Sequence, residues 1–231
     1  SPDGRRIAFT SDRGGGDNIW IMNVDGSDKR QLTKEDFRLI NQASWSPDGN
    51  YIVAKKHFTT QRSLGTGEIW IYHVSGGGGV QLVKRASDTL QKELGEPVYS
   101  PNGDAVYYSR NVTSGPIFEY AQDSTQGTFA IERYDLATGE VTTAVSGYGG
   151  EVRPQPSPDG KNIAFIRRDK DKTELWVKDL ASGQQRMIYG DLDMDMQETW
   201  AVHGFYPLMD WMPDGNSIVL WAGGKLQRVS A

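Results

Sequence analysis

The chain has 231 residues and no cysteine, which excludes disulfides, thiolate metal sites and cysteine nucleophiles. Its formal net charge is −5 at pH 7, and it has no basic stripe that could follow a phosphate backbone, so we expect no nucleic-acid partner. No apolar stretch approaches the roughly 20 residues of a membrane span, so we expect no membrane insertion. The 27 glycines and 10 prolines indicate many turns between short strands.

An internal repeat organises the chain. A Ser-Pro-Asp-Gly turn, varied in the third and fifth copies, begins near residues 1, 46, 100, 157 and 212, and successive prolines are 45, 54, 57 and 55 positions apart. Proline fixes φ at the first central position of such a turn, and glycine supplies the positive φ that starts the next strand. Periods of about 40–50 residues are typical of β-propeller blades.

The predicted strands follow each turn in chain order. Nearly continuous apolar runs come directly after the turns and again one strand later, at 7–10, 19–22, 51–54, 69–72, 105–108, 129–131, 163–166, 175–177 and 218–221. Such runs are typical of sheets that are covered on both faces, as stacked blades are. Short outer strands are expected at 31–33 and 141–143, inner strands at 43–46 and 208–211, and a loop at 86–94.

These patterns predict an all-β fold, a β-propeller of four-stranded antiparallel blades forming one domain over residues 1–231. The chain holds four repeats and part of a fifth. It opens at a turn that normally follows an innermost strand and closes after a third strand, so we expect a piece of a larger propeller that is truncated at both ends. A β-sandwich with recurrent turns is the alternative, and five repeats with strands in phase disfavour it.

The long connections of the predicted blades all belong to one face of the ring. In a four-stranded blade, alternate connections emerge on opposite faces, and one face receives only short turns. The other face receives the long segments, namely 34–40, 57–67, 84–95, 111–128 and 190–205. Long loops on a rigid scaffold are the usual place for binding, so we place the candidate site there.

The candidate binding residues come from those loops: His57, Phe118, Glu119, Tyr120, Glu198, Trp200 and His203. His57 and His203 are predicted on the same face and could approach each other near the channel. The aromatic segments 116–120 and 198–206 suit partner binding, because aromatic side chains bury much area at little entropy cost. The alternative is that they plug the mouth of the channel, and both interpretations stay open.

The sequence predicts no catalytic residue, cofactor or metal. It contains no Gly-x-Ser-x-Gly elbow and no HxH or HExxH pattern. Asp191, Asp193 and Asp195 alternate as at the start of a calcium loop, but Met196 stands where the sharp-turn glycine belongs. A solvated acidic loop is the preferred interpretation.

The repeat resembles a known family. The stretch 1–13, with Asn18 to Met22 and Asp25-Gly26, resembles the repeat of the TolB propeller, which also occurs in prolyl-oligopeptidase-like peptidases. Three further segments, 56–60 with 67–70, 196–206 and 221–225, resemble the propeller that precedes a metal-dependent amidohydrolase domain in some large bacterial proteins. In that family the catalytic residues belong to the later domain, so none is carried over to this chain.

Three functions remain as alternatives. The first is a non-catalytic scaffold, partner-binding or access-gating propeller of a larger bacterial hydrolase, which implies a periplasmic or secreted location and a protein or attached catalytic domain as partner. The second is a stand-alone TolB-type interaction module of the cell envelope. The third is a propeller enzyme, similar to a polysaccharide lyase, whose metal would need His57, Glu68, Glu119, Glu198 and His203. Whether the parent polypeptide is an enzyme is left open.

Overall fold

The computed structural model describes residues 1–57, 66–118, 126–195 and 204–231, and places them in five antiparallel sheets. Blade 1 consists of β1 (Arg6–Ser11), β2 (Asn18–Asn23) and β3 (Arg30–Gln31). Blade 2 consists of β4 (Ile40–Trp45), β5 (Tyr51–His57), β6 (Gly67–His73) and β7 (Val80–Val83). Blade 3 consists of β8 (Leu94–Tyr99), β9 (Ala105–Asn111), β10 (Phe129–Asp135) and β11 (Val141–Val145).

The last two sheets continue the same arrangement. Blade 4 consists of β12 (Glu151–Pro156), β13 (Asn162–Asp169), β14 (Lys172–Asp179) and β15 (Gln185–Tyr189). Blade 5 consists of β16 (Met209–Trp211), β17 (Ser217–Ala222) and β18 (Lys225–Ser230). In every sheet each strand pairs with its neighbour in sequence. The predicted β-propeller architecture is confirmed, and the segment 86–94 contains no helix, as predicted.

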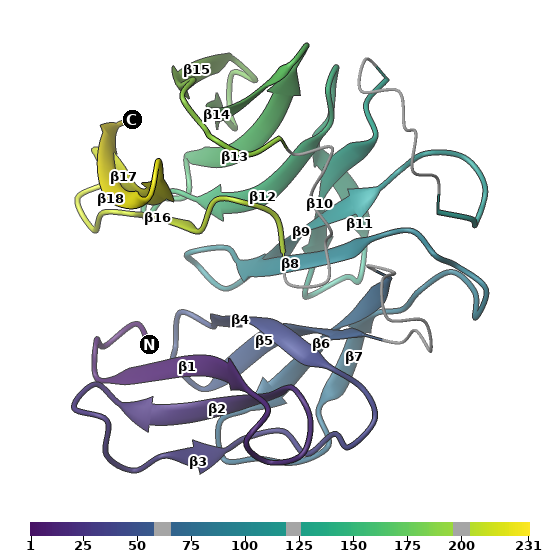
Figure 1. Ribbon diagram of the computed structural model, residues 1–231, viewed down its shortest axis with the longest axis vertical. Helices are drawn as coiled ribbons and strands as arrows, with labels where there is room; N and C mark the ends of the chain where they lie inside the picture. The colour runs from purple at the N-terminus through teal and green to yellow at the C-terminus, as the bar shows by residue number, and fades with distance from the viewer. Residues whose placement is uncertain (58–65, 119–125, 196–203) are drawn as a thin grey trace.

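The blades are arranged around a central space (Figure 1). The Pro-Asp-Gly turns lie on the left in that view, which we call the short-turn face, and the long connections lie on the right, which we call the long-loop face. Apolar residues fill the spaces between neighbouring blades; the largest cluster contains Ile166, Leu175, Ile218 and Leu220 of blades 4 and 5. The described residues contain no helix that is long and apolar enough to cross a membrane.

The short turns are closed by their own side chains. The Ser46 hydroxyl donates to Asp48 Oδ1 at 2.5 Å, and the backbone N–H of Asn50 donates to the same oxygen at 3.0 Å. These hydrogen bonds hold the pKa of the Asp48 carboxyl below its ordinary value, with the Ser46 hydroxyl as the largest cause. The equivalent Asp159 makes the same two contacts, with Ser157 and Lys161. The repeated turn is therefore a structural device.

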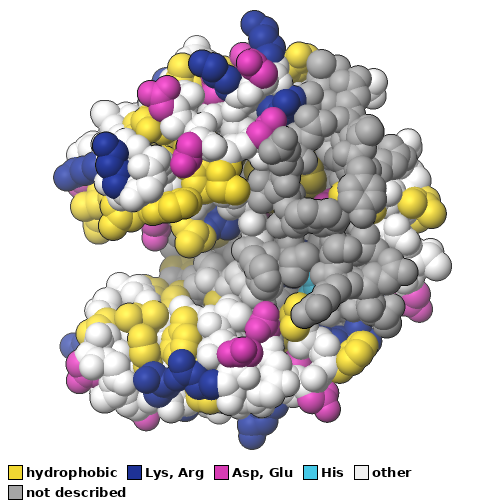
Figure 2. All heavy atoms as spheres, viewed as in Figure 1, with side chains coloured by type: hydrophobic (Ala, Val, Ile, Leu, Met, Phe, Trp, Pro, Cys, Tyr) yellow, Lys and Arg dark blue, Asp and Glu magenta, His cyan; other side chains and the backbone are white. Residues whose placement is uncertain are grey.

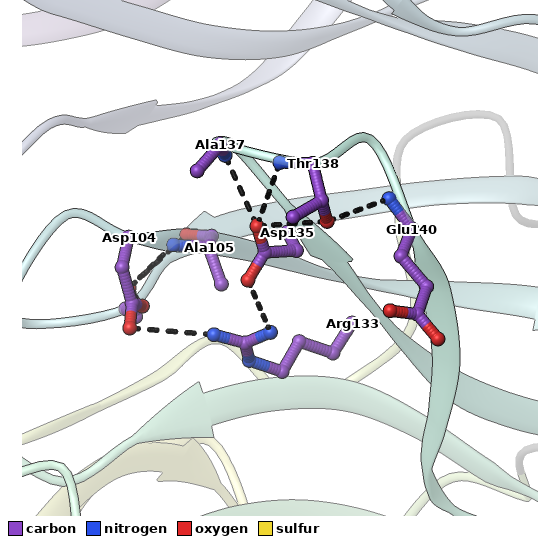
Figure 3. Close-up of polar contacts among 8 residues, drawn as sticks. Asp104, Ala105, Arg133, Asp135, Ala137, Thr138 and Glu140 are labelled. Carbon is purple, nitrogen blue, oxygen red and sulfur yellow. Dashed lines mark hydrogen bonds and ion pairs between the residues drawn. The ribbon is translucent and has the colours of Figure 1, made fainter.

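Outer hairpins on the short-turn face use carboxylates in the same way. In blade 3, Arg133 lies between Asp104, at 3.3 Å, and Asp135, at 3.2 Å (Figure 3). The other oxygen of Asp135 accepts hydrogen bonds from the backbone of Ala137 and from both the N–H and the hydroxyl of Thr138. These carboxylates therefore already have partners within the turns.

Candidate functional site: a buried charged cluster at the long-loop end of the channel

Each inner strand of blades 2 to 4 carries a bulge five residues before its turn proline. The residue at the bulge has a positive φ in all three blades: 57° at Gln42, 56° at Glu96 and 62° at Arg153. A left-handed conformation is unfavourable for such residues, and it persists only where surrounding contacts impose it. We call these three residues the polar relay.

The polar relay links successive blades through hydrogen bonds. Gln42 Oε1 accepts from the backbone N–H of Glu96 at 2.5 Å, and Glu96 Oε2 accepts from the backbone N–H of Arg153 at 2.8 Å. The Arg153 guanidinium returns an ion pair to Glu96 at 3.2 Å, and the Ser109 hydroxyl donates to Glu96 at 2.6 Å. A side chain from one blade thus fixes the strained backbone of the next, which sets the register between the blades.

The polar relay also holds the segment that crosses the long-loop end of the channel. The backbone N–H of Phe205 donates to Glu96 Oε1 at 2.6 Å, and the Phe205 ring packs edge-to-face on Phe129, with centroids 5.0 Å apart. Gly204 has φ of 93°, and a Cβ added there would lie 2.9 Å from Arg153 Nη1 and 3.3 Å from Gln42 Nε2. A side chain at this position would be strained and would displace the Arg153 and Gln42 side chains. Residues 204 and 205 are therefore held against blade 3 at this end of the channel.

Lys55 extends the cluster toward blade 2. Its side chain is completely buried on the side of β5 that faces β8, and the bare Cα positions of Gly67 and Gly95 make room for it. Burial lowers the pKa of Lys55 to about 8, although the nearby carboxylates of Glu93 and Glu96 act in the opposite direction. Burial likewise raises the pKa of Glu93, which accepts a hydrogen bond from Asn111 at 3.2 Å. Buried ionisable groups with shifted pKa values are typical of functional sites and of structural ion-pair networks.

Two of the predicted site residues fall in the described ranges. His57 ends β5 and is buried, with its backbone N–H donating to the Leu39 carbonyl at 2.7 Å, so it borders the cluster from the same side of β5 as Lys55. Phe118 is half-buried and its N–H donates to Gln91 Oε1 at 3.2 Å, which ties the loop 111–118 to the loop 84–95. Glu119, Tyr120, Glu198, Trp200 and His203 lie outside the described residues.

Sequence reasoning missed the centre of the cluster. Lys55, Glu93, Glu96 and Arg153 are not among the predicted site residues, because that prediction considers only the long loops. Counting back five residues from each turn proline gives Gln42, Glu96 and Arg153. Polar residues at one repeat position that faces the channel were the signal that could have revealed the polar relay.

The acidic loop is not arranged around a cation. Asp195 is bound by Arg168 through two hydrogen bonds of 2.7 and 2.9 Å, and Asp193 accepts a hydrogen bond from the Tyr206 hydroxyl. Within the four described ranges, no group of three or more His, Asp or Glu side chains is placed to hold a metal.

The family model described as PD40, TolB beta propeller domain, matches residues 1–133, which is more than half of the chain. The chain belongs to this family. An uncharacterized protein of Agrobacterium fabrum is 28% identical over 170 residues, covering 72% of this chain and 53% of that protein. Dipeptidyl-peptidase 5 of Porphyromonas gingivalis is 27% identical over 130 residues, covering 54% of this chain and 17% of that protein.

Among solved structures, TolB from Acinetobacter baumannii superposes on this TolB-like propeller with a TM-score of 0.71 at 18% identity. The match covers 100% of this chain and 52% of that one. An oligogalacturonate lyase in complex with manganese gives a TM-score of 0.51 at 12% identity, covering 99% of this chain and 86% of that one. At these identities the likeness concerns the fold alone. The chain spans about half or less of the length of the curated relatives it matches.

Proposed function

We propose that this TolB-like propeller is a non-catalytic scaffold whose long-loop face binds a protein partner or the catalytic domain of a larger hydrolase. The observation that carries the proposal is a set of exposed apolar side chains on connections of the long-loop face: Phe37, Val112, Ile117, Tyr148 and Met194. Phe37 and Ile117 are 67% and 60% exposed. Where exposed apolar side chains form a patch, they mark protein interaction sites.

The buried cluster supports this proposal because it stiffens the surface from which those loops project. The polar relay joins blades 2, 3 and 4 and anchors residues 204 and 205 on Glu96. A scaffold held in this way reduces the loss of conformational freedom when a partner binds. The short-turn face differs, since its carboxylates are engaged in turn contacts.

The finer proposal is that the partner is an amidohydrolase domain of the same polypeptide, in a bacterial periplasmic or secreted protein. It rests on the resemblance of 56–60 with 67–70, 196–206 and 221–225 to propellers of that kind. The peptidase named above is a relative of which this chain covers only 17%, and this agrees with a propeller serving as one module of a longer hydrolase.

Blade 5 also suggests further blades. The position eight residues after the turn proline holds the buried side chains of Lys55, Ser109 and Ile166 in blades 2 to 4. In blade 5 the same position holds Trp221, which is 43% exposed. Leu226, its partner across β17 and β18, is exposed as well. An additional blade packed on this surface would cover both side chains.

A stand-alone TolB-type interaction module is the second candidate, and the superposition on TolB over the whole chain favours it. A lyase-like enzyme is less well supported. Glu68 pairs with Lys56 while His57 pairs with Gly67, so Glu68 and His57 point to opposite faces of the sheet. The Glu68 carboxylate also accepts hydrogen bonds from Trp70 and Gln81.

Sequencing the parent gene on both sides of this segment discriminates between the first two candidates. A downstream barrel domain with histidine metal-ligand motifs supports the amidohydrolase proposal, and an upstream α/β domain with a stop after the last blade supports the TolB-type module. Binding then tests the docking face. The flanking domain is expressed separately. The propeller with Phe37→Ser and Ile117→Ser is expected to bind it at least tenfold more weakly than the wild-type propeller does.

A matched control uses two exposed valines of the short-turn side, Val24 and Val80. The double variant Val24→Ser and Val80→Ser removes similar apolar area from the opposite face and is expected to bind normally. Equal loss of binding in both double variants, or in neither, would contradict a docking surface on the long-loop face. Thermal unfolding of each variant shows whether it remains folded.

A further inference from the structure

A pocket lies between the short turns of blades 2 and 3. Figure 2 shows that the molecule is hollowed on the left, the side of the short turns, with hydrophobic side chains along the hollow. The pocket has a volume of about 570 Å³, which lies in the range of small-molecule sites. Its walls include Asp48, Tyr51 and Ile71 of blade 2 and Tyr99, Gly103 and Leu136 of blade 3. A carboxylate therefore borders a largely apolar space.

The corresponding place between blades 1 and 2 is filled by an arginine of the chain. Arg6 holds its guanidinium carbon 4.8 Å from the centroid of the Trp45 ring, and its Nη2 donates to the Gly49 carbonyl at 3.2 Å. A Cβ added at Gly49 would lie 3.6 Å from that guanidinium. The repeat can therefore seat a guanidinium group against the turn glycine of the next blade.

The pocket between blades 3 and 4 also contains an arginine of the chain. Arg133 lines that pocket and pairs with Asp104 at 3.3 Å. In blade 2 the positions of Arg6 and Arg133 are held by Tyr51 and Ile71, so no basic residue lines the pocket between blades 2 and 3. This pocket has the same surroundings without the internal cation.

The turn carboxylate of blade 2 lacks the ion pair that its equivalents make. Asp159 lies 3.7 Å from Lys161, and Asp214 lies 3.6 Å from Arg228. Asp48 has no such partner among the described residues. Its hydrogen bonds, the largest being that from the Ser46 hydroxyl, hold its pKa below the ordinary value, so it is charged at neutral pH. Asp48 therefore offers a negative charge at the rim of the pocket.

Two further groups of the pocket are open to a ligand. Tyr99 is only 8% exposed, and its hydroxyl makes no hydrogen bond within the described part of the chain. Burial raises the pKa of Tyr99, and Asp48 and Tyr51 act on it in the same direction, which places the hydroxyl on the side of this pocket. A Cβ added at Gly103 would meet only Pro47 within 4 Å, so the place that Arg6 takes against Gly49 is open here.

We propose that the pocket between blades 2 and 3 binds an arginine side chain of a partner protein, with Asp48 as the counter-ion. The Tyr99 hydroxyl and the Gly103 carbonyl accept further hydrogen bonds from the guanidinium, and Tyr51 and Ile71 pack along its methylene groups. Guanidinium groups make charge-assisted hydrogen bonds to carboxylates and pack on aromatic rings. The proposal is independent of the docking function, which concerns the opposite face.

Titration of the whole, isotope-labelled chain with N-acetylarginine methylamide, followed by NMR, tests the site. We expect saturable shifts at the Gly103 amide, and binding at least tenfold tighter than that of the uncharged isostere N-acetylcitrulline methylamide. Asp48→Asn should remove that difference, and it should fold because blade 3 carries Asn102 at the same turn position. The matched control is Asp159→Asn, the equivalent change in blade 4, which should leave both affinities unchanged.

Tyr51→Arg tests the comparison with blade 1 directly. It places an arginine of the chain where Arg6 stands, at a position that is 41% exposed, and should fill the pocket from within and abolish binding of the probe. Thermal unfolding shows whether each variant remains folded.

Equal binding of the arginine and citrulline probes, full binding by Asp48→Asn or by folded Tyr51→Arg, or no binding at all would overturn the proposal. Equal affinity for N-acetyllysine methylamide would overturn the assignment to a guanidinium group. Butylguanidinium distinguishes the source: weaker binding than that of the arginine probe supports a protein side chain, and tighter binding would overturn it in favour of a free small guanidinium compound.

Discussion

Lys55 and Ile166 occupy the same repeat position, eight residues after a turn proline, and both side chains are completely buried between blades. Lys55 lies with Glu93 and Glu96 at the contact of blades 2 and 3, whereas Ile166 lies in the apolar cluster shared by blades 4 and 5. The repeat therefore requires only that this position be filled. The charges between blades 2 and 3 are a feature added to the fold, and replacing buried charges by apolar groups often costs a fold nothing.

The first test places a lysine in the apolar interface and asks whether that interface tolerates a buried amine. Ile166→Lys puts an amine among Leu175, Ile218 and Leu220, which offer it no carboxylate. An unpaired buried charge is among the most destabilising changes known, so we expect a loss of more than about 4 kcal/mol in the free energy of unfolding, measured by urea denaturation. Ile166→Leu is the volume-matched control and should cost less than about 1.5 kcal/mol. A stable Ile166→Lys protein would show that the two interfaces are interchangeable.

The next test removes the hub of the charged interface. Glu96 accepts hydrogen bonds from Ser109, Phe205 and both the backbone and the guanidinium of Arg153. Glu96→Ala leaves the buried Arg153 without its counter-ion, so we expect a loss of about 3–5 kcal/mol in the free energy of unfolding. Glu140→Ala, at an exposed position of the short-turn face, should cost less than about 0.5 kcal/mol. A cost below about 1 kcal/mol for Glu96→Ala would mean that the polar relay does not hold the blades together.

The apolar interface between blades 4 and 5 could be predicted from the sequence, whereas the charged interface between blades 2 and 3 could not. The turns and the continuous apolar runs fix the strands because their periodicity is local and is repeated five times. The positive φ at Gln42, Glu96 and Arg153 depends on contacts between blades, over 54 to 57 residues of sequence. Local sequence carries no signal for such contacts. The burial of Lys55 depends on Gly67 and Gly95, which lie against its side chain and are 12 and 40 residues away in the sequence.

The pH dependence of stability distinguishes the charged interface from the apolar one. The pKa of Lys55 is about 8 in the folded chain against an ordinary value of 10.5, so between these values the unfolded chain holds a proton that the folded chain lacks. Stability therefore rises with pH across this window, by up to about 3 kcal/mol from this group. Lys55→Met should lack that rise. Urea midpoints at pH 7, 9 and 10.5 measure the difference, with the exposed Lys161→Met as control. Parallel pH profiles of wild type and Lys55→Met would refute the burial of a titrating amine.

The smallest effect should separate contact from backbone strain at the long-loop end of the channel. Gly204 and Gly15 have similar positive φ values, 93° and 101°, but a Cβ at Gly15 would meet nothing within 4 Å. Gly15→Ala should therefore cost only the conformational penalty, about 1 kcal/mol. Gly204→Ala adds a clash with Arg153 and Gln42, so we expect about 1–2 kcal/mol beyond the control, because the strained polar relay must move. The same variant should increase hydrogen exchange at the Phe205 amide, whose partner is Glu96. If both variants lose the same free energy of unfolding and hydrogen exchange at the Phe205 amide is unchanged, Gly204 does not hold the polar relay in place. The charged interface would then end at Arg153.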